Sequence, residues 1–194
     1  VTETGPVLCL NTPMAARTSS VGKFLPEIEW RLDPVPGIDS GGNLVVRGPN
    51  LMEGYLLYEQ GFRPVEGWYA TGDVVSVDSA GYVFIQARLK RFAKIAGEMI
   101  NLQIVEEAAS ACFGTGLHAA VAAADGRKGE RVVLFTTNSQ TKREVLREYF
   151  VQTGHSVLYV PSHIIPIATM PLLGTGKPDY LGLQKQAEII LNGV

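Results

Sequence analysis

Cysteine and histidine are scarce in this chain of 194 residues, which contains two cysteines and three histidines. Cys9 and Cys112 lack the CxxC or metal-ligand spacing of a redox or zinc site, so we expect reduced cysteines with structural roles. His118, His155 and His163 do not cluster, which argues against a histidine-based metal site and favours surface or core positions.

Long apolar runs and an excess of one charge are also missing. No window approaches the roughly 18 apolar residues of a membrane-spanning helix. The formal net charge of -2 gives no reason to expect nucleic acid or an anionic membrane as a partner. The chain starts Val-Thr-Glu-Thr-Gly-Pro, without a methionine or the basic and apolar regions of a signal peptide. We therefore expect a soluble fragment of a longer protein.

The first part of the chain is predicted to be β-rich. Apolar residues alternate over residues 22–48, with a turn around Pro34 and Pro36. Residues 50–55 are expected to hold one helical turn. Residues 68–87 are predicted to form a strand, a turn at residues 78–81 and a second strand. This part does not contain a complete core of its own.

The rest of the chain is predicted to mix helices and strands. Leu102, Val105, Ala109 and Cys112 have helical spacing, and Asn101 is suited to cap that helix. The other expected elements are strand 92–95, a hairpin of 118–124 with 131–136, helix 141–153 with a capping box of Thr141 and Glu144, strand 162–167 and helix 180–191. We place a domain boundary at Leu89-Lys90 and predict an α+β fold, with domains 1–89 and 90–194.

A glycine-rich turn near the end of the chain, Gly174-Thr175-Gly176-Lys177, presents a lysine. Such a turn suits phosphate or carboxylate chemistry, because glycine permits close approach and lysine supplies a mobile charge. It is not a P-loop, since Pro171 stands where that motif needs glycine and Pro178 where it needs serine or threonine. A solvated turn with an exposed lysine is the alternative.

The string Thr71-Gly72-Asp73 places a carboxylate beside a glycine on a strand. An aspartate there is suited to accept hydrogen bonds from two ribose hydroxyls, and the alternative is an aspartate that caps a turn. The guanidinium of Arg88 is suited to hold a ribose or phosphate. Alternatively, Arg88 belongs to a solvated basic run with Lys90, Arg91 and Lys94, or to a nucleic-acid patch, which the lack of aromatic partners disfavours.

Five strings in a fixed order resemble the adenylate-forming superfamily of acyl-CoA synthetases, peptide-synthetase adenylation domains and luciferases. The resemblance covers nearly the whole chain, and the five strings are Gly54-Tyr55, Trp68-Tyr69-Ala70-Thr71-Gly72-Asp73, Gly81-Tyr82, the run from Arg88 to Glu98, and the run from Pro171 to Asp179. Val1-Thr2-Glu3 resembles the tail of a further string of that family. Ala87 departs from the glycine usual before the arginine.

This resemblance implies a role for each matching residue. Thr2 and Glu3 would contact the phosphate of ATP and Mg²⁺, with Glu3 as the metal ligand. Asp73 would bind the ribose with help from Arg88. Lys90 would be the hinge about which a small α+β domain, residues 90–194, swings against the β-rich closing subdomain of the large domain. The remaining implied residues serve catalysis and the thioester step: Lys177 at the substrate carboxylate and α-phosphate, and Lys94, Ala96 and Gly97 at the incoming thiol.

The runs 91–99 and 171–179 are most similar to the bacterial bifunctional 2-acylglycerophosphoethanolamine acyltransferase/acyl-[acyl-carrier-protein] synthetase. That resemblance implies an enzyme at the cytoplasmic side of the inner membrane, which uses ATP and Mg²⁺ to activate a fatty acid. It loads the acyl group onto acyl carrier protein and reacylates a lysophospholipid through a domain absent from this chain. The chain alone is then expected to be inactive. The alternatives are a free-standing fatty acyl-CoA ligase and a non-catalytic carrier-protein docking module.

Overall fold

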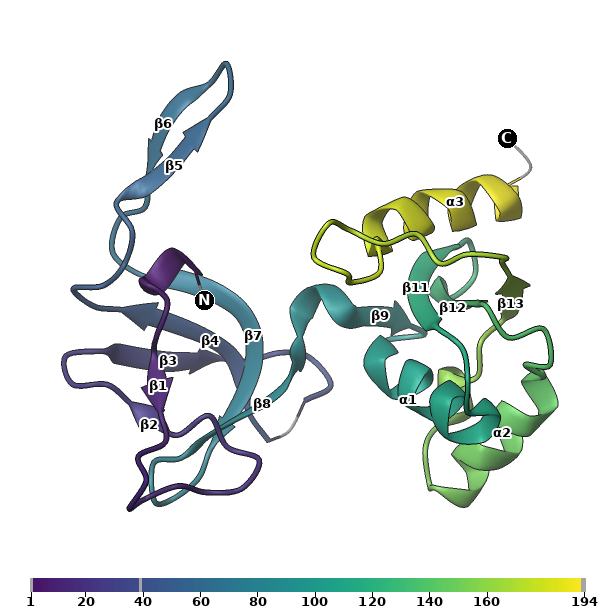
Figure 1. Cartoon of the computed structure of the whole chain (residues 1–194), viewed down its shortest axis with the longest axis horizontal. Helices are drawn as coiled ribbons and strands as arrows, with labels where there is room; N and C mark the ends of the chain where they lie inside the picture. Colours follow the sequence, from purple (N-terminus) through teal and green to yellow (C-terminus); the bar gives the residue numbers. More distant parts are fainter. Residues whose placement is uncertain (1, 39, 193–194) are drawn as a thin grey trace. The chain divides into compact units, whose positions relative to one another are not determined.

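The computed structural model describes residues 2–38 and 40–192, and its contacts divide the chain into two compact units, Val1–Lys90 and Arg91–Val194 (Figure 1). Val1, which begins the predicted Val1-Thr2-Glu3 string, lies outside the described residues. These are called unit 1 and unit 2. Among the described residues, no helix is both long and apolar enough to cross a membrane.

Unit 1 is built on an antiparallel sheet. Its strands follow the order β3 (Glu29–Asp33), β4 (Gly42–Arg47), β7 (Tyr69–Val77) and β8 (Val83–Arg88). The pair β1 (Cys9–Leu10) and β2 (Lys23–Phe24) and the 3-10 turn η1 (Thr2–Thr4) complete the N-terminal part. A hairpin of β5 (Gly54–Leu57) and β6 (Gly61–Pro64) projects away from this sheet (Figure 1).

An apolar cluster packs against one face of the unit 1 sheet. Leu44 and Val46 of β4 pack with Val75 of β7 and Val83 of β8, and Leu8 closes the cluster. Val45 of β4 and Val74 of β7 are buried as well, so the central strands do not show the strict alternation of buried and exposed residues that was expected over residues 22–48. The face that is buried here is also the face from which Asp73 projects into a cavity, described below.

Unit 2 consists of a mixed sheet with helices on both faces (Figure 1). Its elements are β9 (Phe92–Ile95), β10 (Glu98–Asn101), α1 (Leu102–Phe113), β11 (His118–Asp125), β12 (Gly129–Thr136), α2 (Arg143–Gln152), η3 (Val157–Tyr159), β13 (His163–Pro166) and α3 (Tyr180–Asn192). The sheet order is β10-β9-β12-β11, and β13 pairs in parallel with β12. The turn η2 (Leu89–Arg91) leads into β9.

Strands β11 and β12 of unit 2 are apolar on both sides because both faces of the sheet are covered. Leu134 of β12 faces α1 and α2, whereas its neighbour Phe135 faces α3. Phe150 of α2 and Leu183 of α3 are fully buried on opposite faces. Strands of this kind have continuous hydrophobic runs in place of polar alternation, as residues 118–124 and 131–136 do.

Most of the predicted elements are confirmed, and two details are wrong. Asn101 caps α1 by accepting a hydrogen bond from Gln103 N at 3.0 Å, as expected. Residues 50–55 do not form a helical turn, because Gly54 already pairs with Pro64 in the β5–β6 hairpin, which was not predicted. The Thr141 capping box is absent, since α2 begins at Arg143 and the Thr141 hydroxyl lies 3.3 Å from Thr136 Oγ1.

Candidate functional site

The Thr71-Gly72-Asp73 string forms a local irregularity in β7. Gly72 has a φ of 75°, a conformation that other residues rarely adopt, and the register between β7 and β8 shifts just after it. The buried Thr71 hydroxyl donates to Leu44 O at 3.0 Å and accepts from Asp73 N at 3.1 Å. Asp73 is therefore fixed inside a strand, so the alternative that it caps a turn is wrong.

Asp73 and Arg88 form a direct ion pair. They are register partners on β7 and β8, and Arg88 Nε donates to Asp73 Oδ1 at 2.6 Å. The side chain of Asp73 is 13% exposed and that of Arg88 is 61% exposed, so the carboxylate is buried and the guanidinium reaches outward. The hydrogen bond from Arg88 to Asp73, and then the charge of Asp73, raise the pKa of Arg88. Among the described residues no donor occupies Asp73 Oδ2, which leaves an acceptor for a hydroxyl.

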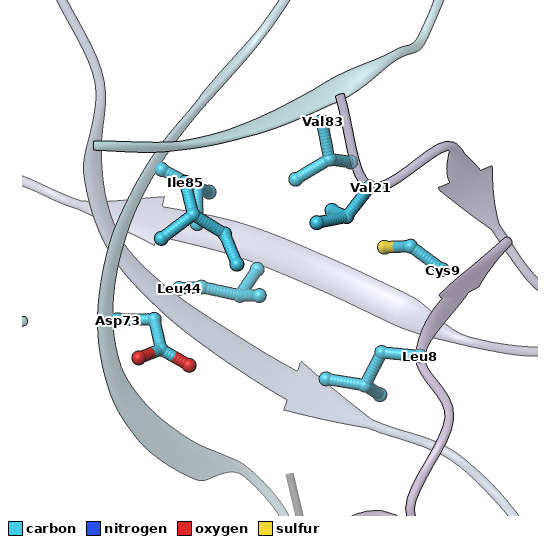
Figure 2. A pocket seen from close by; sticks show the side chains of 8 residues that line it. Leu8, Cys9, Val21, Leu44, Asp73, Val83 and Ile85 are labelled. Carbon is cyan, nitrogen blue, oxygen red and sulfur yellow. The ribbon is translucent and has the colours of Figure 1, made fainter. Parts of the chain in front are cut away.

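Asp73 is the charged residue in the lining of a cavity of about 190 Å³. Figure 2 shows its carboxylate at one side of a group of apolar side chains, which are contributed by β4, β7, β8 and the N-terminal segment. Cys9 also lines this cavity, and burial raises the pKa of its thiol to about 11. Cys9 is therefore a neutral, structural cysteine at neutral pH, as expected.

Glu3 lies in the same part of unit 1 as the Asp73–Arg88 pair. Its charge contributes to the raised pKa of Arg88, after the larger effects of Asp73 and desolvation. Burial raises the pKa of Tyr69, with smaller effects from Tyr55, whose hydroxyl is 3.3 Å away, and from Glu3. Asn50 anchors the segment that carries Glu3, because its side chain donates to Thr4 O at 2.6 Å. Thr2 is exposed at the start of η1.

The described residues contain no group of three or more histidine, cysteine, aspartate or glutamate side chains that could hold a metal by themselves. In nucleotide sites Mg²⁺ is usually bound by one or two carboxylates plus substrate phosphates, so the donor to look for is a single carboxylate. Glu3 is half-buried and supplies such a carboxylate, close enough to Arg88 for its charge to raise the pKa of that arginine. The residues present therefore fit a metal that binds together with a nucleotide.

In unit 2, the predicted thiol-facing residues lie on and after β9. Lys94 is exposed, and the two-residue turn Ala96-Gly97 joins β9 to β10 with φ values of 51° and 90°. Both central residues of such a turn need a positive φ, and glycine and asparagine adopt it most readily. The turn is held to the residue that precedes β12 by the hydrogen bond from Ala96 N to Lys128 O at 2.9 Å.

Substitutions at Ala96 and Gly97 should change the stability of unit 2 in opposite directions. Ala96→Asn should stabilise unit 2 by about 0.5–1 kcal/mol, because asparagine tolerates a left-handed backbone better than alanine does. Gly97→Ala should destabilise it by about 1–2 kcal/mol, although a Cβ there meets nothing within 4 Å. Urea unfolding followed by circular dichroism measures both, with Gly126→Ala as a control in open space. Equal effects of the two turn substitutions would contradict this account of the turn.

Lys177 lies in a short closed loop, residues 171–179, here called the Lys177 loop. Leu173 N donates to Lys177 O and Asp179 N donates to Pro171 O, at 2.8 and 2.9 Å. The Asp179 side chain accepts from Gly182 N at 3.0 Å and so caps α3. The lysine side chain is exposed, and its backbone is fixed at both ends of the loop.

Thr2, Glu3, Asp73 and Arg88 thus belong to unit 1, and Lys94, Ala96, Gly97 and Lys177 belong to unit 2. Lys90 is exposed within η2 and is the last residue of unit 1. The basic run of residues 88–94 is not a uniformly solvated face. Arg91 is only 16% exposed and pairs with Glu106 at 2.6 Å. Glu106 and its second partner Tyr180 were not singled out from the sequence, because they lie far apart along the chain and no string contains them together.

Comparison with individual known proteins shows which family this chain belongs to. No family model matches the chain. Curated relatives include a salicylyl-CoA synthase / salicylate adenylyltransferase from Streptomyces sp, 32% identical over 154 residues, which are 76% of this chain and 28% of the relative. A second is 4-coumarate--CoA ligase 2 from Oryza sativa subsp. japonica, 31% identical over 188 residues, covering 86% of this chain and 33% of the relative.

Solved structures share the fold. The o-succinylbenzoate CoA synthetase from Bacillus subtilis, in complex with its acyl-adenylate intermediate, matches 94% of this chain and 39% of its own with a TM-score of 0.74 and 21% identity. The anthranilate CoA ligase AuaEII, in complex with anthranoyl-AMP, matches 99% of this chain and 39% of its own with a TM-score of 0.72 and 21% identity. The chain belongs to the adenylate-forming acyl-CoA ligase superfamily. It spans about a third of the length of the curated relatives it matches.

Proposed function

We propose that this chain is the C-terminal part of an ATP-dependent ligase that joins a carboxylic acid to a thiol through an acyl-adenylate. The observation that carries the proposal is the buried Asp73 carboxylate, which is held by Arg88 and lines a cavity with one oxygen available to a hydroxyl. Solved relatives with an acyl-adenylate or ATP bound support the nucleotide assignment. In this proposal residues 1–89 close the large domain, and residues 90–194 form the mobile domain with Lys90 as hinge.

The chemistry has two steps with different demands. A carboxylate oxygen of the acid attacks the α-phosphorus of ATP, and pyrophosphate leaves; the thiol then attacks the acyl carbonyl, loses its proton, and AMP leaves. In the first step Asp73 Oδ2 accepts from a ribose hydroxyl, while the outward guanidinium of Arg88 offers its remaining donors to ribose or phosphate. Mg²⁺ neutralises phosphate charge when it is bound, and Glu3 is the residue in the described part of unit 1 that would hold it beside Thr2.

Lys177 is the proposed catalytic residue of the first step. Its ammonium would stabilise the charge that builds on the carboxylate and α-phosphate in the transition state. The closed Lys177 loop suits this role, because an exposed lysine on a fixed backbone can reach a substrate without prior ordering of the loop. Lys94, Ala96 and Gly97 are assigned to the second step, in which the β9–β10 turn would face the thiol after rotation at Lys90.

The proposed acid is a fatty acid and the proposed thiol is the phosphopantetheine of acyl carrier protein, within a bifunctional membrane-associated enzyme that also reacylates lysophospholipid. The runs 91–99 and 171–179 support this version. The second candidate is a free-standing acyl- or aryl-CoA ligase, which the names of the curated relatives favour. A non-catalytic docking module is the third, and the retained Asp73–Arg88 pair argues against it.

The choice of thiol is tested with the full-length protein. Given ATP, Mg²⁺ and palmitate, we expect acyl transfer to purified holo-acyl carrier protein to be at least about tenfold more efficient than transfer to CoA, which corresponds to about 1.4 kcal/mol of discrimination. Apo-acyl carrier protein, which lacks the thiol, is the control. A preference for CoA would be consistent with a ligase but would contradict the proposal that acyl carrier protein is the acceptor. If no acyl-adenylate forms with either fatty or aryl acids, the ligase proposals are wrong and the non-catalytic docking module is the remaining candidate.

A further inference from the structure

Arg91, Glu106 and Tyr180 form a closed network within unit 2, here called the Arg91 network. Arg91 Nη2 donates to Glu106 Oε1 at 2.6 Å, and Tyr180 OH donates to Glu106 Oε2 at 3.3 Å. The Arg91 guanidinium carbon lies 3.7 Å from the centre of the Tyr180 ring, a close cation–π contact. Arg91 and Glu106 are each about 15% exposed, so the network is largely shielded from water.

The network also completes the free edge of β11. Ala120 N donates to Glu106 Oε1 at 2.7 Å, and Arg91 Nη1 donates to Ala120 O at 2.9 Å. The two side chains thereby provide the acceptor and donor that a neighbouring strand would provide. This satisfies the backbone of a strand that pairs with β12 on its other side. Both charges are fixed by several hydrogen bonds, which makes the network rigid.

The three residues come from positions that matter for the proposed reaction. Arg91 directly follows Lys90, the proposed hinge, and is the first residue of unit 2. Tyr180 is the first residue of α3 and lies three positions after Lys177. Glu106 lies in the middle of α1 and joins the two. The start of α3 is thus tied directly to the residue that follows the hinge.

We infer that the Arg91 network positions Lys177: it fixes the start of α3, and with it the Lys177 loop, to the residue after Lys90. This inference rests on the proposed function, because it assigns to Arg91, Glu106 and Tyr180 an effect on adenylation through Lys177. None of the three touches the reacting atoms in this account, so they are positioning residues. When the hinge rotates, the network carries the Lys177 loop together with β9 and β10.

Substitution of Tyr180 in the full-length protein tests the inference. Tyr180→Leu keeps an apolar contact but removes the ring and hydroxyl, and we expect acid-dependent pyrophosphate exchange to fall about tenfold in kcat. The KM for ATP and for the acid should change less than about twofold, because the contacts that bind both substrates before the reaction are retained. Tyr180→Phe keeps the ring over Arg91 and should retain most of the activity. Arg91→Lys, which keeps the charge but loses the planar fork, should fall between the two.

Two readouts separate positioning from a structural role. Thioester formation from added acyl-adenylate does not need Lys177 and should stay within about twofold in Tyr180→Leu, whereas loss of folded protein would lower both steps together. The double variant Lys177→Ala with Tyr180→Leu should be no slower in exchange than Lys177→Ala alone, because residues that act as a unit are not additive. Additive losses, or no loss in Tyr180→Leu and Arg91→Lys, would overturn the inference.

The outcome also distinguishes failure of this inference from failure of the proposed function. If Lys177→Ala abolishes exchange but Tyr180→Leu and Arg91→Lys do not reduce it, the network has no positioning role and the ligase proposal stands. If Lys177→Ala leaves exchange intact, the assignment of Lys177 is wrong, and the inference falls with it.

Discussion

Lys177→Ala in the full-length protein should lower acid-dependent pyrophosphate exchange about 100- to 1,000-fold, the typical cost of removing one group that stabilises transition-state charge. The loss should appear in kcat, since the ammonium acts where charge develops and contributes little to ground-state binding. Folding should be unaffected, because Lys177 is exposed and the hydrogen bonds of the Lys177 loop involve backbone atoms. Steady-state exchange kinetics measure the effect.

Two other lysines serve as controls for Lys177. Lys185→Ala removes an exposed lysine of α3 and should leave exchange unchanged. Lys94→Ala should spare exchange and slow thioester formation from added acyl-adenylate, because Lys94 is assigned to the second step. If Lys177→Ala spares exchange, its catalytic role is wrong; if Lys94→Ala spares thioester formation, the assignment of β9 and the β9–β10 turn to the thiol step is wrong.

Asp73→Asn should raise the KM for ATP about 10- to 100-fold, which corresponds to the loss of charged hydrogen bonds worth about 1.5–3 kcal/mol. The amide keeps the shape of the side chain but weakens acceptance from a ribose hydroxyl. Stability should fall by less than about 1 kcal/mol, because Arg88 is 61% exposed and remains solvated without its partner. Exchange kinetics at varied ATP and urea unfolding provide the two measurements.

Asp33→Asn is the matched control for Asp73. Asp33 also pairs with an arginine on the unit 1 sheet, Arg31, at 2.9 Å, but both of these side chains are about half exposed and line no part of the Asp73 cavity. Its replacement should change neither the KM for ATP nor kcat. An equal KM increase in both variants would indicate a general charge effect and would contradict a specific role for Asp73.

Elements with a strong periodic pattern were predictable from the sequence. The apolar runs of β11 and β12, the helical spacing of α1 and the Asn101 cap are all found as expected. The β5–β6 hairpin was missed because its strands are exposed and carry no alternation of buried and solvated residues. The Thr141 cap was wrong because tertiary structure offers its hydroxyl a partner, Thr136, that a local pattern does not show.

The sequence predicted which residues belong to the candidate site, but it did not predict the contacts that these residues make with one another. Asp73 and Arg88 were each assigned to the nucleotide, but their direct pairing follows from the β7–β8 register, which a bulge shifts by one position. Arg91 fell within an apparent basic run, and only the packing of α1 and α3 on β11 shows it to be a shielded partner of Glu106. Contacts between residues 15 to 89 positions apart depend on the folded chain, and no local string encodes them.

The most direct test of the central claim is acid-dependent exchange of labelled pyrophosphate into ATP by the full-length protein with Mg²⁺. A panel of saturated fatty acids and the aryl acids salicylate and 4-coumarate covers the acids considered above. The account predicts no exchange without acid, exchange with at least one member of the panel, and its loss in Lys177→Ala. Exchange that is independent of acid, or no exchange with any acid in a protein that is folded and binds ATP, would contradict the claim.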